Sequence, residues 1–250
     1  MEMIWMRPER AARGPKPAYS RAEVAAVGVR VADAEGIEAV SMRRIAAELG
    51  AGTTSLYRYV SKKDDILDLM GDAIMGEEDP PARTGDWRAD LREIARRTRA
   101  VMLRHPWSAA LSAGRPSLGP NGLRWMEASF AALGDLGLDA DDLLAKVSAV
   151  ATYVRGTVAG ELGEREAARR SGLTIDGWMA EQSPYGKVIR DSGRYPTFTR
   201  IMEEARIPHL PDRLERLFAL GLEQVLDGLA ASLGNPRRGG GHPHGAGSQP

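Results

Sequence analysis

The sequence contains no cysteine, and this absence excludes disulfide bonds, thiolate metal sites and cysteine nucleophiles. It has no run of about 18 apolar residues, the length that a helix needs to cross a bilayer, so we expect no membrane partner. Residues 1–20 lack the apolar core and the small-residue cleavage site of a secretory signal. Aromatic residues make up only 6% of the chain, but 43% of its 250 residues are hydrophobic, which suffices for a sizeable core in one or two domains.

The formal net charge is zero, but the charges are distributed unevenly. Residues 1–63 carry 11 Lys and Arg against 7 Asp and Glu, an excess of four positive charges, whereas residues 64–79 carry seven acids and no base. A basic segment of this kind indicates a nucleic-acid surface, although a charged stretch is also typical of a solvated helix face. Charge alone therefore leaves both interpretations open.

Helix signals divide the N-terminal third into four helices behind a flexible start. Residues 1–19 are rich in proline, glycine and basic residues, so we expect a disordered basic arm. Ser20 and Glu23 form a capping-box pattern for a first helix that stops at Gly36. Ser41 can cap a second helix that Gly50 ends, Thr53 or Thr54 a short third, and a fourth starts near Lys63.

The remainder of the sequence also has helical periodicity. We expect a linker at 80–86, an amphipathic helix from Trp87 to about Arg104, and further helices at about 122–136, 140–162, 176–189, 197–205 and 212–233. No strict two-residue alternation bounded by turn residues occurs, so no sheet is expected. The segment 234–250 is rich in glycine and proline, which predicts a disordered tail. The predicted fold class is all-α.

Two of the short helices, joined by Gly50-Ala-Gly-Thr53, match a helix-turn-helix unit. With Leu49, Leu56 and Val60 packed inward, the polar side chains of the third helix face outward, as in a helix that enters the major groove. Small residues at the helix start allow close backbone approach, and tyrosines and lysines suit phosphate contacts. The candidate DNA-binding residues are Arg43, Arg44, Gly52, Thr53, Thr54, Ser55, Tyr57, Arg58, Tyr59, Lys62 and Lys63.

The stretch Ser41–Asp68, SMRRIAAELGAGTTSLYRYVSKKDDILD, closely resembles the DNA-binding signature of the tetracycline-repressor (TetR/AcrR) family. The resemblance covers about residues 20–75 and implies that Tyr57 and Lys63 contact phosphates. It also implies that Arg43, Thr54 and their neighbours Gly52, Thr53 and Arg58 face the bases or the flanking backbone. It further implies a DNA-binding domain with its connecting helix at 20–79 and a ligand-binding and dimerisation domain at 87–233. The residues that carry the match are Gly50, Leu56, Tyr57, Val60, Lys63 and Asp64.

The second domain resembles the tetracycline-repressor subtype around Gly114-Arg115-Pro116, but it departs from that subtype in its ligand residues. By this anchor, the position of the family's magnesium-coordinating histidine falls on Leu111, and the drug-contacting positions fall near Ile94 and Thr98. We therefore expect neither a metal nor another cofactor, and an inducer that is more apolar than magnesium–tetracycline. Ordinary core packing is the alternative for each of the candidate pocket residues, which are Ile94, Thr98, Met102, Trp107, Leu111, Trp125, Met126, Phe130, Val150, Tyr153, Val154 and Trp178, with Met179 and Met202 as a far wall.

The last helix, over about 212–233, carries apolar residues on many sides and small residues that permit close helix approach. The helix at 140–162 has a similar composition. Together they predict a four-helix interface between two copies across a two-fold axis, with burial inside one subunit as the alternative.

No motif of an enzyme is present: the sequence lacks a GxSxG nucleophile elbow, a P-loop and an HExxH zinc motif. We predict a cytoplasmic, homodimeric transcriptional regulator, not an enzyme, that binds a pseudo-palindromic double-stranded DNA operator and a small-molecule inducer. Repression is the expected mode. The alternatives are an activator, or a helical small-molecule-binding or catalytic protein whose helix-turn-helix is vestigial.

Overall fold

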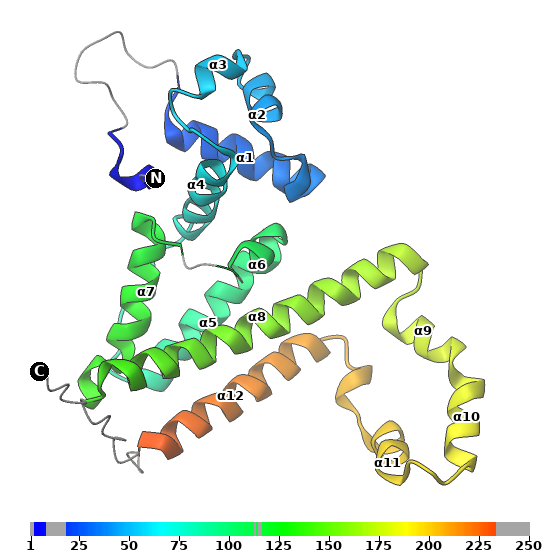
Figure 1. Ribbon diagram of the computed structural model, residues 1–250. Coiled ribbons are helices and arrows are strands. Elements are labelled where there is room, and N and C mark those ends of the chain that lie inside the picture. Colours follow the sequence, from blue (N-terminus) through cyan, green and yellow to red (C-terminus); the bar gives the residue numbers. More distant parts are fainter. Residues whose placement is uncertain (1–2, 9–18, 113, 115–116, 234–250) are drawn as a thin grey trace, which may run out of the picture.

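The computed structural model describes residues 3–8, 19–112, 114 and 117–233, which form helices and connecting turns without any strand (Figure 1). The prediction of an all-α fold is confirmed. The N-terminal third contains η1 (Ile4–Met6), α1 (Arg21–Glu35), η2 (Ile37–Ala39), α2 (Met42–Glu48), α3 (Thr53–Leu56) and α4 (Lys63–Met75). The remainder contains α5 (Trp87–Arg104), α6 (Trp107–Ser112), α7 (Pro120–Leu133), η3 (Gly134–Leu136), α8 (Ala140–Ser171), α9 (Ile175–Glu181), α10 (Ser183–Asp191), α11 (Pro196–Glu204), η4 (Ile207–His209) and α12 (Arg213–Leu233).

The helix ends in the first third follow local capping chemistry. Ser20 and Glu23 form the complete capping box at the start of α1, and Gly36 follows its end with a φ of 88° that favours glycine. The Ser41 side chain accepts a hydrogen bond from the backbone N–H of Arg44, and Gly50 turns the chain out of α2 with a φ of 65°. The predicted threonine cap of α3 is wrong, because Gly52 occupies the N-cap position without a side-chain hydrogen bond.

A first core holds the helix-turn-helix unit together. Its buried side chains come mainly from α1, α2, α3 and α4, with Val101 and Trp107 added from α5 and α6. Ile4 is only 1% exposed in this core, and the Arg7 guanidinium lies 2.6 Å from Asp65. The predicted disordered arm at 1–19 is therefore wrong for residues 3–8, because a buried isoleucine and an ion pair attach them to the domain. Residues 9–18 and the predicted tail at 234–250 lie outside the described residues.

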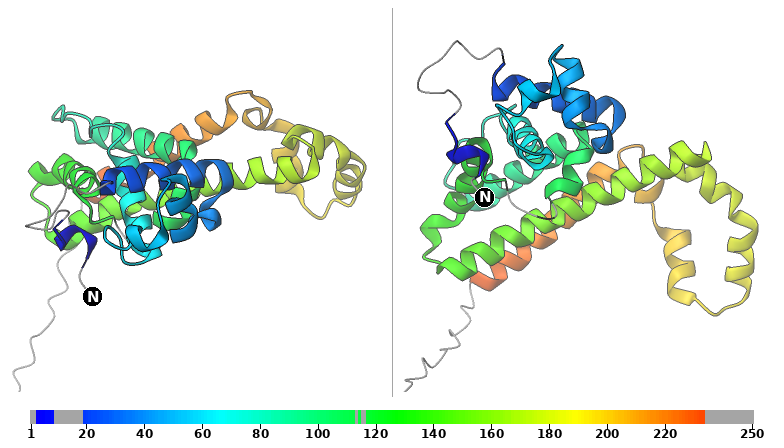
Figure 2. Two further views of the ribbon diagram at one scale, coloured as in Figure 1. Left: turned by 90° about the horizontal axis from the view of Figure 1, so that it is seen from above. Right: turned by 45° about the horizontal axis from the view of Figure 1, so that its top comes forward.

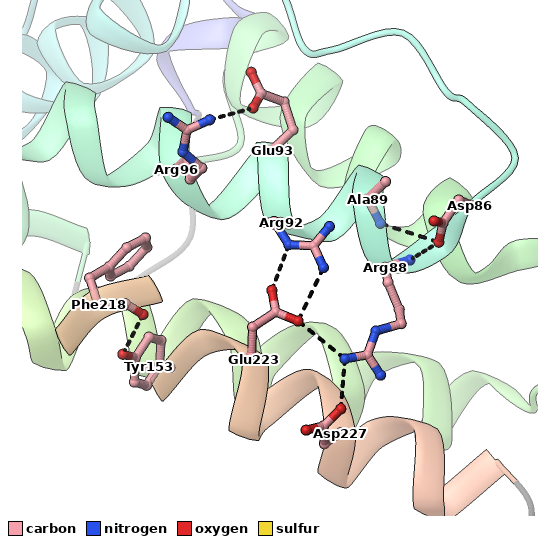
Figure 3. A network of polar contacts seen from close by, with 10 residues as sticks. All are labelled: Asp86, Arg88, Ala89, Arg92, Glu93, Arg96, Tyr153, Phe218, Glu223 and Asp227. Atoms are coloured by element: carbon pink, nitrogen blue, oxygen red, sulfur yellow. Dashed lines mark hydrogen bonds and ion pairs between the residues drawn. The ribbon is translucent and has the colours of Figure 1, made fainter. Parts of the chain in front are cut away.

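A second core lies between α5, α7, α8 and α12. Along its edge, Figure 3 shows two arginines of α5 turned toward the acids of α12: Arg92 Nε lies 2.5 Å from Glu223 Oε1, and Arg88 Nη2 lies 2.6 Å from Asp227 Oδ1. The hydrogen bond from Arg92 lowers the pKa of the Glu223 carboxyl below its ordinary value. These pairs link α12 to α5, the helix that also forms part of the cavity described below.

The helices α9, α10 and α11 form an arm that projects from the paired α8 and α12 (Figures 1 and 2). Helix α8 continues to Ser171 instead of ending near residue 162, and it stops at Gly172, whose φ is 72°. The single helix predicted over 176–189 is interrupted at Gln182, because Pro184 cannot continue the hydrogen bonding of the preceding helix. None of the three arm helices has a buried residue.

Candidate DNA-binding surface and ligand cavity

The short helix α3 presents its polar side chains away from the first core. Leu56 is 1% exposed and Val60 is fully buried, so these two residues anchor the helix-turn-helix from inside. On the outer side, Gly52, Thr54, Ser55, Tyr57 and Arg58 are exposed and Thr53 is half-buried. This arrangement gives the outward polar face that the sequence predicts, and the contacts of these residues with DNA stay predictions.

The two arginines of α2 have different environments. Arg43 is exposed. Arg44 lies 2.7 Å from Glu35 and 2.6 Å from Glu48, and the hydrogen bonds with Glu35 and Glu48 raise the pKa of its guanidinium above the ordinary value. Arg44 would have to exchange these two carboxylates for a phosphate, whereas Arg43 needs no such exchange for its exposed side chain to reach DNA, and both contacts stay predictions.

Tyr59 was predicted to contact the DNA backbone, and the structure contradicts this role. Its side chain is only 8% exposed and packs edge-on against Tyr19, with the ring centres 6.3 Å apart. The Tyr59 hydroxyl accepts a hydrogen bond from the backbone N–H of Tyr19, and the Tyr19 hydroxyl donates to the Leu49 carbonyl. The two tyrosines therefore hold the start of α1 on the helix-turn-helix, which helical periodicity alone did not reveal.

The lysines at the start of α4 lie beside an acidic helix whose carboxylates have structural partners. Lys62 and Lys63 are half-buried, and Lys62 Nζ lies 3.0 Å from Asp64. Burial by itself would raise the pKa of the Asp65 carboxyl. Asp65 also accepts hydrogen bonds from Arg7 and Ser61, and together these lower its pKa below the ordinary value. The change from basic to acidic residues at α4 thus marks the helix that turns away from the predicted DNA surface.

A cavity of about 400 Å³ lies between the connecting helix α4 and helices α5 and α6. Three of the predicted pocket residues contribute to its wall: Thr98, Met102 and Leu111. The α4 side of the cavity was not predicted from the sequence, although Leu67, Gly71 and Ile74 have the i, i+4 and i+7 spacing that puts residues on one helix face. The wall residues that were not predicted include Leu67, Gly71, Ile74, Met75, Val101 and Ser108.

The other predicted pocket residues lie elsewhere. Ile94, Trp125, Val150 and Val154 are buried in the second core, and Trp107 is buried in the first, so the core-packing alternative holds for them. Tyr153 stacks on Phe218 and donates its hydroxyl hydrogen to the Phe218 carbonyl at 2.8 Å. Met126 and Phe130 are half-buried on α7 and do not contribute to the wall of the cavity. Trp178 is 48% exposed and lines, with Met179 and Met202, a separate hollow of about 700 Å³ on the arm.

Neither a metal cluster nor a membrane helix occurs in the part of the chain that the structure describes. No group of three or more histidine, aspartate or glutamate side chains there has the geometry to hold a metal ion. Among the same residues, no helix is long and apolar enough to cross a bilayer.

Comparison with known proteins identifies the family. Residues 25–70 match the family model for bacterial regulatory proteins of the tetR family, and residues 79–233 match the model for the tetracyclin repressor-like C-terminal domain. The chain belongs to the TetR family. It is a DNA-binding transcriptional regulator with an N-terminal helix-turn-helix domain and a larger helical C-terminal domain.

Relatives of this TetR-family protein include a curated repressor and solved structures. It is 39% identical over 239 residues to the transcriptional repressor DrrR1 of Streptomyces coeruleorubidus, a match that covers 95% of this chain and 87% of the relative. Apo ActR of Streptomyces coelicolor superimposes with a TM-score of 0.73 at 27% identity, covering 88% of this chain and 99% of that chain. ActR in complex with actinorhodin gives a TM-score of 0.71 at 27% identity, with 87% and 98% covered.

Proposed function

We propose that this regulator is a repressor that binds a pseudo-palindromic double-stranded DNA operator as a homodimer and is released by a small, mostly apolar molecule. One observation carries the proposal: the cavity wall includes Leu67, Gly71 and Ile74 of α4, the same helix that follows the helix-turn-helix. A molecule in the cavity touches the connection between the two domains directly. The repressor DrrR1 and the actinorhodin complex of ActR support a ligand-released repressor.

The chemistry of the cavity wall supports an apolar ligand with a few polar groups. Leu67, Ile74, Met75, Val101 and Met102 supply apolar surface, and the two methionines adapt to different shapes. Hydroxyl groups of Thr98, Ser108, Ser112 and Ser117 are distributed around them, and the charged residues Lys62, Asp64 and Asp68 on the α4 side also belong to the wall. The wall contains no histidine, and Leu111 stands where the tetracycline-repressor subtype has its magnesium ligand, so a magnesium–tetracycline complex is a poor fit.

Exposed apolar surface on α8 and α12 supports the homodimer. Leu144 on α8 is 55% exposed, and Leu217 and Leu220 on α12 are 48% and 52% exposed. Small residues such as Gly156 on α8 and Gly228 on α12 are also exposed and allow close approach of a partner helix. A two-fold dimer through these helices presents two α3 helices to half-sites about 34 Å or more apart.

The same reasoning extends to location and catalysis. A regulator that acts on DNA in a bacterial cell works in the cytoplasm, so we propose that location for this chain. We also propose that the chain is not an enzyme, because its family consists of transcriptional regulators and its sequence lacks the motifs of the common hydrolases and nucleotide-binding enzymes.

A mobility-shift titration tests the repressor proposal. The protein is titrated against its own upstream DNA and against a scrambled duplex at several salt concentrations. We expect a saturable complex on the upstream DNA that weakens steeply with salt. Arg58→Ala removes an exposed charge on the predicted DNA surface, and Lys187→Ala on the arm removes an exposed charge far from it.

Arg58→Ala should weaken the complex and Lys187→Ala should leave it unchanged. Operator recognition would be contradicted if the protein bound the upstream DNA and the scrambled duplex equally well and a selection from random duplexes also yielded no preferred sequence. A complex that no apolar compound dissociates, while an unrelated signal does, would contradict the ligand part of the proposal alone.

A further inference from the structure

A buried histidine connects the two domains through both of its ring nitrogens. His105 is 4% exposed, its Nδ1 lies 2.9 Å from Asp33 Oδ1, and its Nε2 lies 3.0 Å from Glu77 Oε1. Trp107 is also buried and donates its indole N–H to Asp33 Oδ1 at 2.6 Å. We refer to Asp33, Glu77, Arg104, His105 and Trp107 as the His105 cluster.

The cluster lies where the DNA-binding unit meets the cavity wall. Asp33 belongs to the last turn of α1, and Glu77 follows the end of α4. His105 ends α5, and Trp107 begins α6, the helix that contributes Ser108 and Leu111 to the cavity. The cluster therefore attaches the first helix of the DNA-binding unit to the wall of the ligand cavity by side chains alone.

Hydrogen-bond chemistry decides the protonation state that makes both contacts. An ionised carboxylate only accepts hydrogen bonds, and a neutral imidazole carries one N–H. The two contacts of His105 with Asp33 and Glu77 are therefore satisfied together only by the imidazolium, which carries two. In the neutral form, one carboxylate oxygen faces a ring lone pair at about the same distance, which is repulsive.

The charges that face His105 come from three directions. Helix α1 provides Asp33, and the segment after α4 provides Glu77, so a carboxylate lies against each ring nitrogen. From α5 comes Arg104, whose guanidinium pairs with the second oxygen of Glu77 at 2.5 Å and with Glu78 at 3.1 Å. Helix α6 contributes Trp107, which is uncharged. Histidine is the side chain whose charge commonly changes between about pH 5 and pH 8.

We propose that the proton on His105 is a second regulatory input of this protein: it fixes the DNA-binding unit on the ligand domain, and its loss loosens that joint and weakens DNA binding without any ligand. DNA binding is then weaker because a recognition helix on a loosened joint moves more freely, and binding must restrict this motion at a cost in free energy. The inference goes beyond ligand release, but its DNA readout rests on the proposed function.

The first test reads the joint itself, without DNA. Trp107 lies 5.9 Å from His105, ring centre to ring centre, and an imidazolium quenches indole emission more strongly than neutral imidazole. The full chain is titrated from about pH 5.5 to pH 8.5, and the emission of a Trp107→Phe variant is subtracted. We expect the Trp107 emission to rise with pH in the wild type and to stay flat in His105→Gln. His209→Gln, at an exposed histidine of η4, should behave like the wild type.

The second test measures affinity for the upstream DNA over the same pH range. We expect the wild type to lose about tenfold in affinity as pH rises, the ratio that corresponds to one contact of about 1.4 kcal/mol. His105→Gln should lose much less. Asp33→Asn is the second variant, because its side-chain oxygen can still accept from Trp107 while the charge is gone; it should also have a flattened profile.

Identical pH profiles for the wild type and both variants would overturn the proposal. A pH-dependent emission with a pH-independent DNA affinity would overturn it as well, because the proton would then not reach the recognition helix. If no duplex is bound at any pH, the proposed function fails by itself. In that case the thermal midpoint decides: it must fall between pH 5.5 and pH 8.5 by more in the wild type than in His105→Gln.

Discussion

The contact between α1 and α4 in the DNA-binding unit provides a prediction that the structure makes quantitative. Gly28 is buried in α1, and a methyl group built on it lies 2.6 Å from Met70 Sδ and 2.8 Å from Met70 Cγ. Met70 is fully buried, so its side chain can move only by displacing or repacking against its neighbours in the core. Ordinary contacts between carbon atoms need about 3.5–4.0 Å. Gly28→Ala therefore forces α1 and α4 apart or moves Met70 out of its position.

Two opposing effects determine the size of the change. Alanine is favoured over glycine inside a helix by about 1 kcal/mol, whereas overpacking a core costs about 1–3 kcal/mol. The net loss of unfolding free energy for Gly28→Ala is therefore roughly 0–2 kcal/mol. Gly71→Ala is the matched control, because Gly71 lies in α4 and, among the described residues, its added methyl group meets no atom within 4 Å apart from its chain neighbours and the backbone of its own helix. The control should gain about 1 kcal/mol, so the two variants should differ by about 1–3 kcal/mol.

Urea unfolding followed by circular dichroism measures this difference at one fixed protein concentration, because a dimer's stability depends on concentration. We expect the midpoint of Gly28→Ala to lie below that of the wild type and the midpoint of Gly71→Ala to lie above it. Equal midpoints for the two variants would refute the reasoning, since the α1–α4 contact would then have room for a methyl group. A Met70→Ala change in the Gly28→Ala background should be less destabilising than in the wild type.

Four further variants test individual contacts, two of which are predicted contacts with DNA. Lys63→Ala should weaken binding to all duplexes and reduce the salt dependence by about one phosphate contact per subunit. Arg43→Ala should weaken binding and also relax the preference at one base pair. If Arg43→Ala lost equal affinity on specific and random DNA, base reading by Arg43 would be contradicted. Tyr153→Phe removes the hydrogen bond to the carbonyl in α12 and should lower the unfolding free energy by about 1 kcal/mol, and an unchanged urea midpoint would argue against that bond. Arg7→Ala removes the hydrogen bond that helps to hold the pKa of Asp65 below its ordinary value. The stabilisation from a lowered carboxyl pKa is present above about pH 4 and is lost as the pH falls below that value. Arg7→Ala should therefore be less stable than the wild type at neutral pH and should lose less unfolding free energy on acidification. Parallel curves of stability against pH for the two proteins would contradict this.

The functional importance of the α4 helix emerges from two independent features. Leu67, Gly71 and Ile74 of α4 line the cavity. The buried Asp72 of α4 accepts hydrogen bonds from the backbone N–H of Gly122 and from the side-chain amide of Asn121, both in the first turn of α7. The helix that follows the recognition helix is thus attached to the second domain by a carboxylate and borders the cavity as well. In the function proposed above, this double attachment is what would couple a bound ligand to the DNA-binding unit.

Local chemistry in the sequence predicted the elements of this protein with good accuracy. The Ser20–Glu23 capping box, the Ser41 cap and the glycines at positions 36 and 50 set helix ends that the structure has at the same places. The amphipathic segment Trp87–Arg104 has the predicted bounds. Caps, turns and periodicity act within a few residues, so a single sequence contains the information that determines them.

Which apolar residues form the cavity and which form the core was decided only by the tertiary structure. Thr98 and Ile94 lie one helical turn apart on α5, yet Thr98 lines the cavity and Ile94 is buried in the second core. Tyr59 was expected at the DNA surface and is buried against Tyr19, and Ile4 was expected in a disordered arm and is buried in the first core. Periodicity indicates that one face of a helix is covered, but the identity of the covering group depends on segments distant in sequence. The sequence by itself therefore determined the helices and the family to which they belong, whereas packing between distant segments decided where the cavity lies and which side chains remain free to bind.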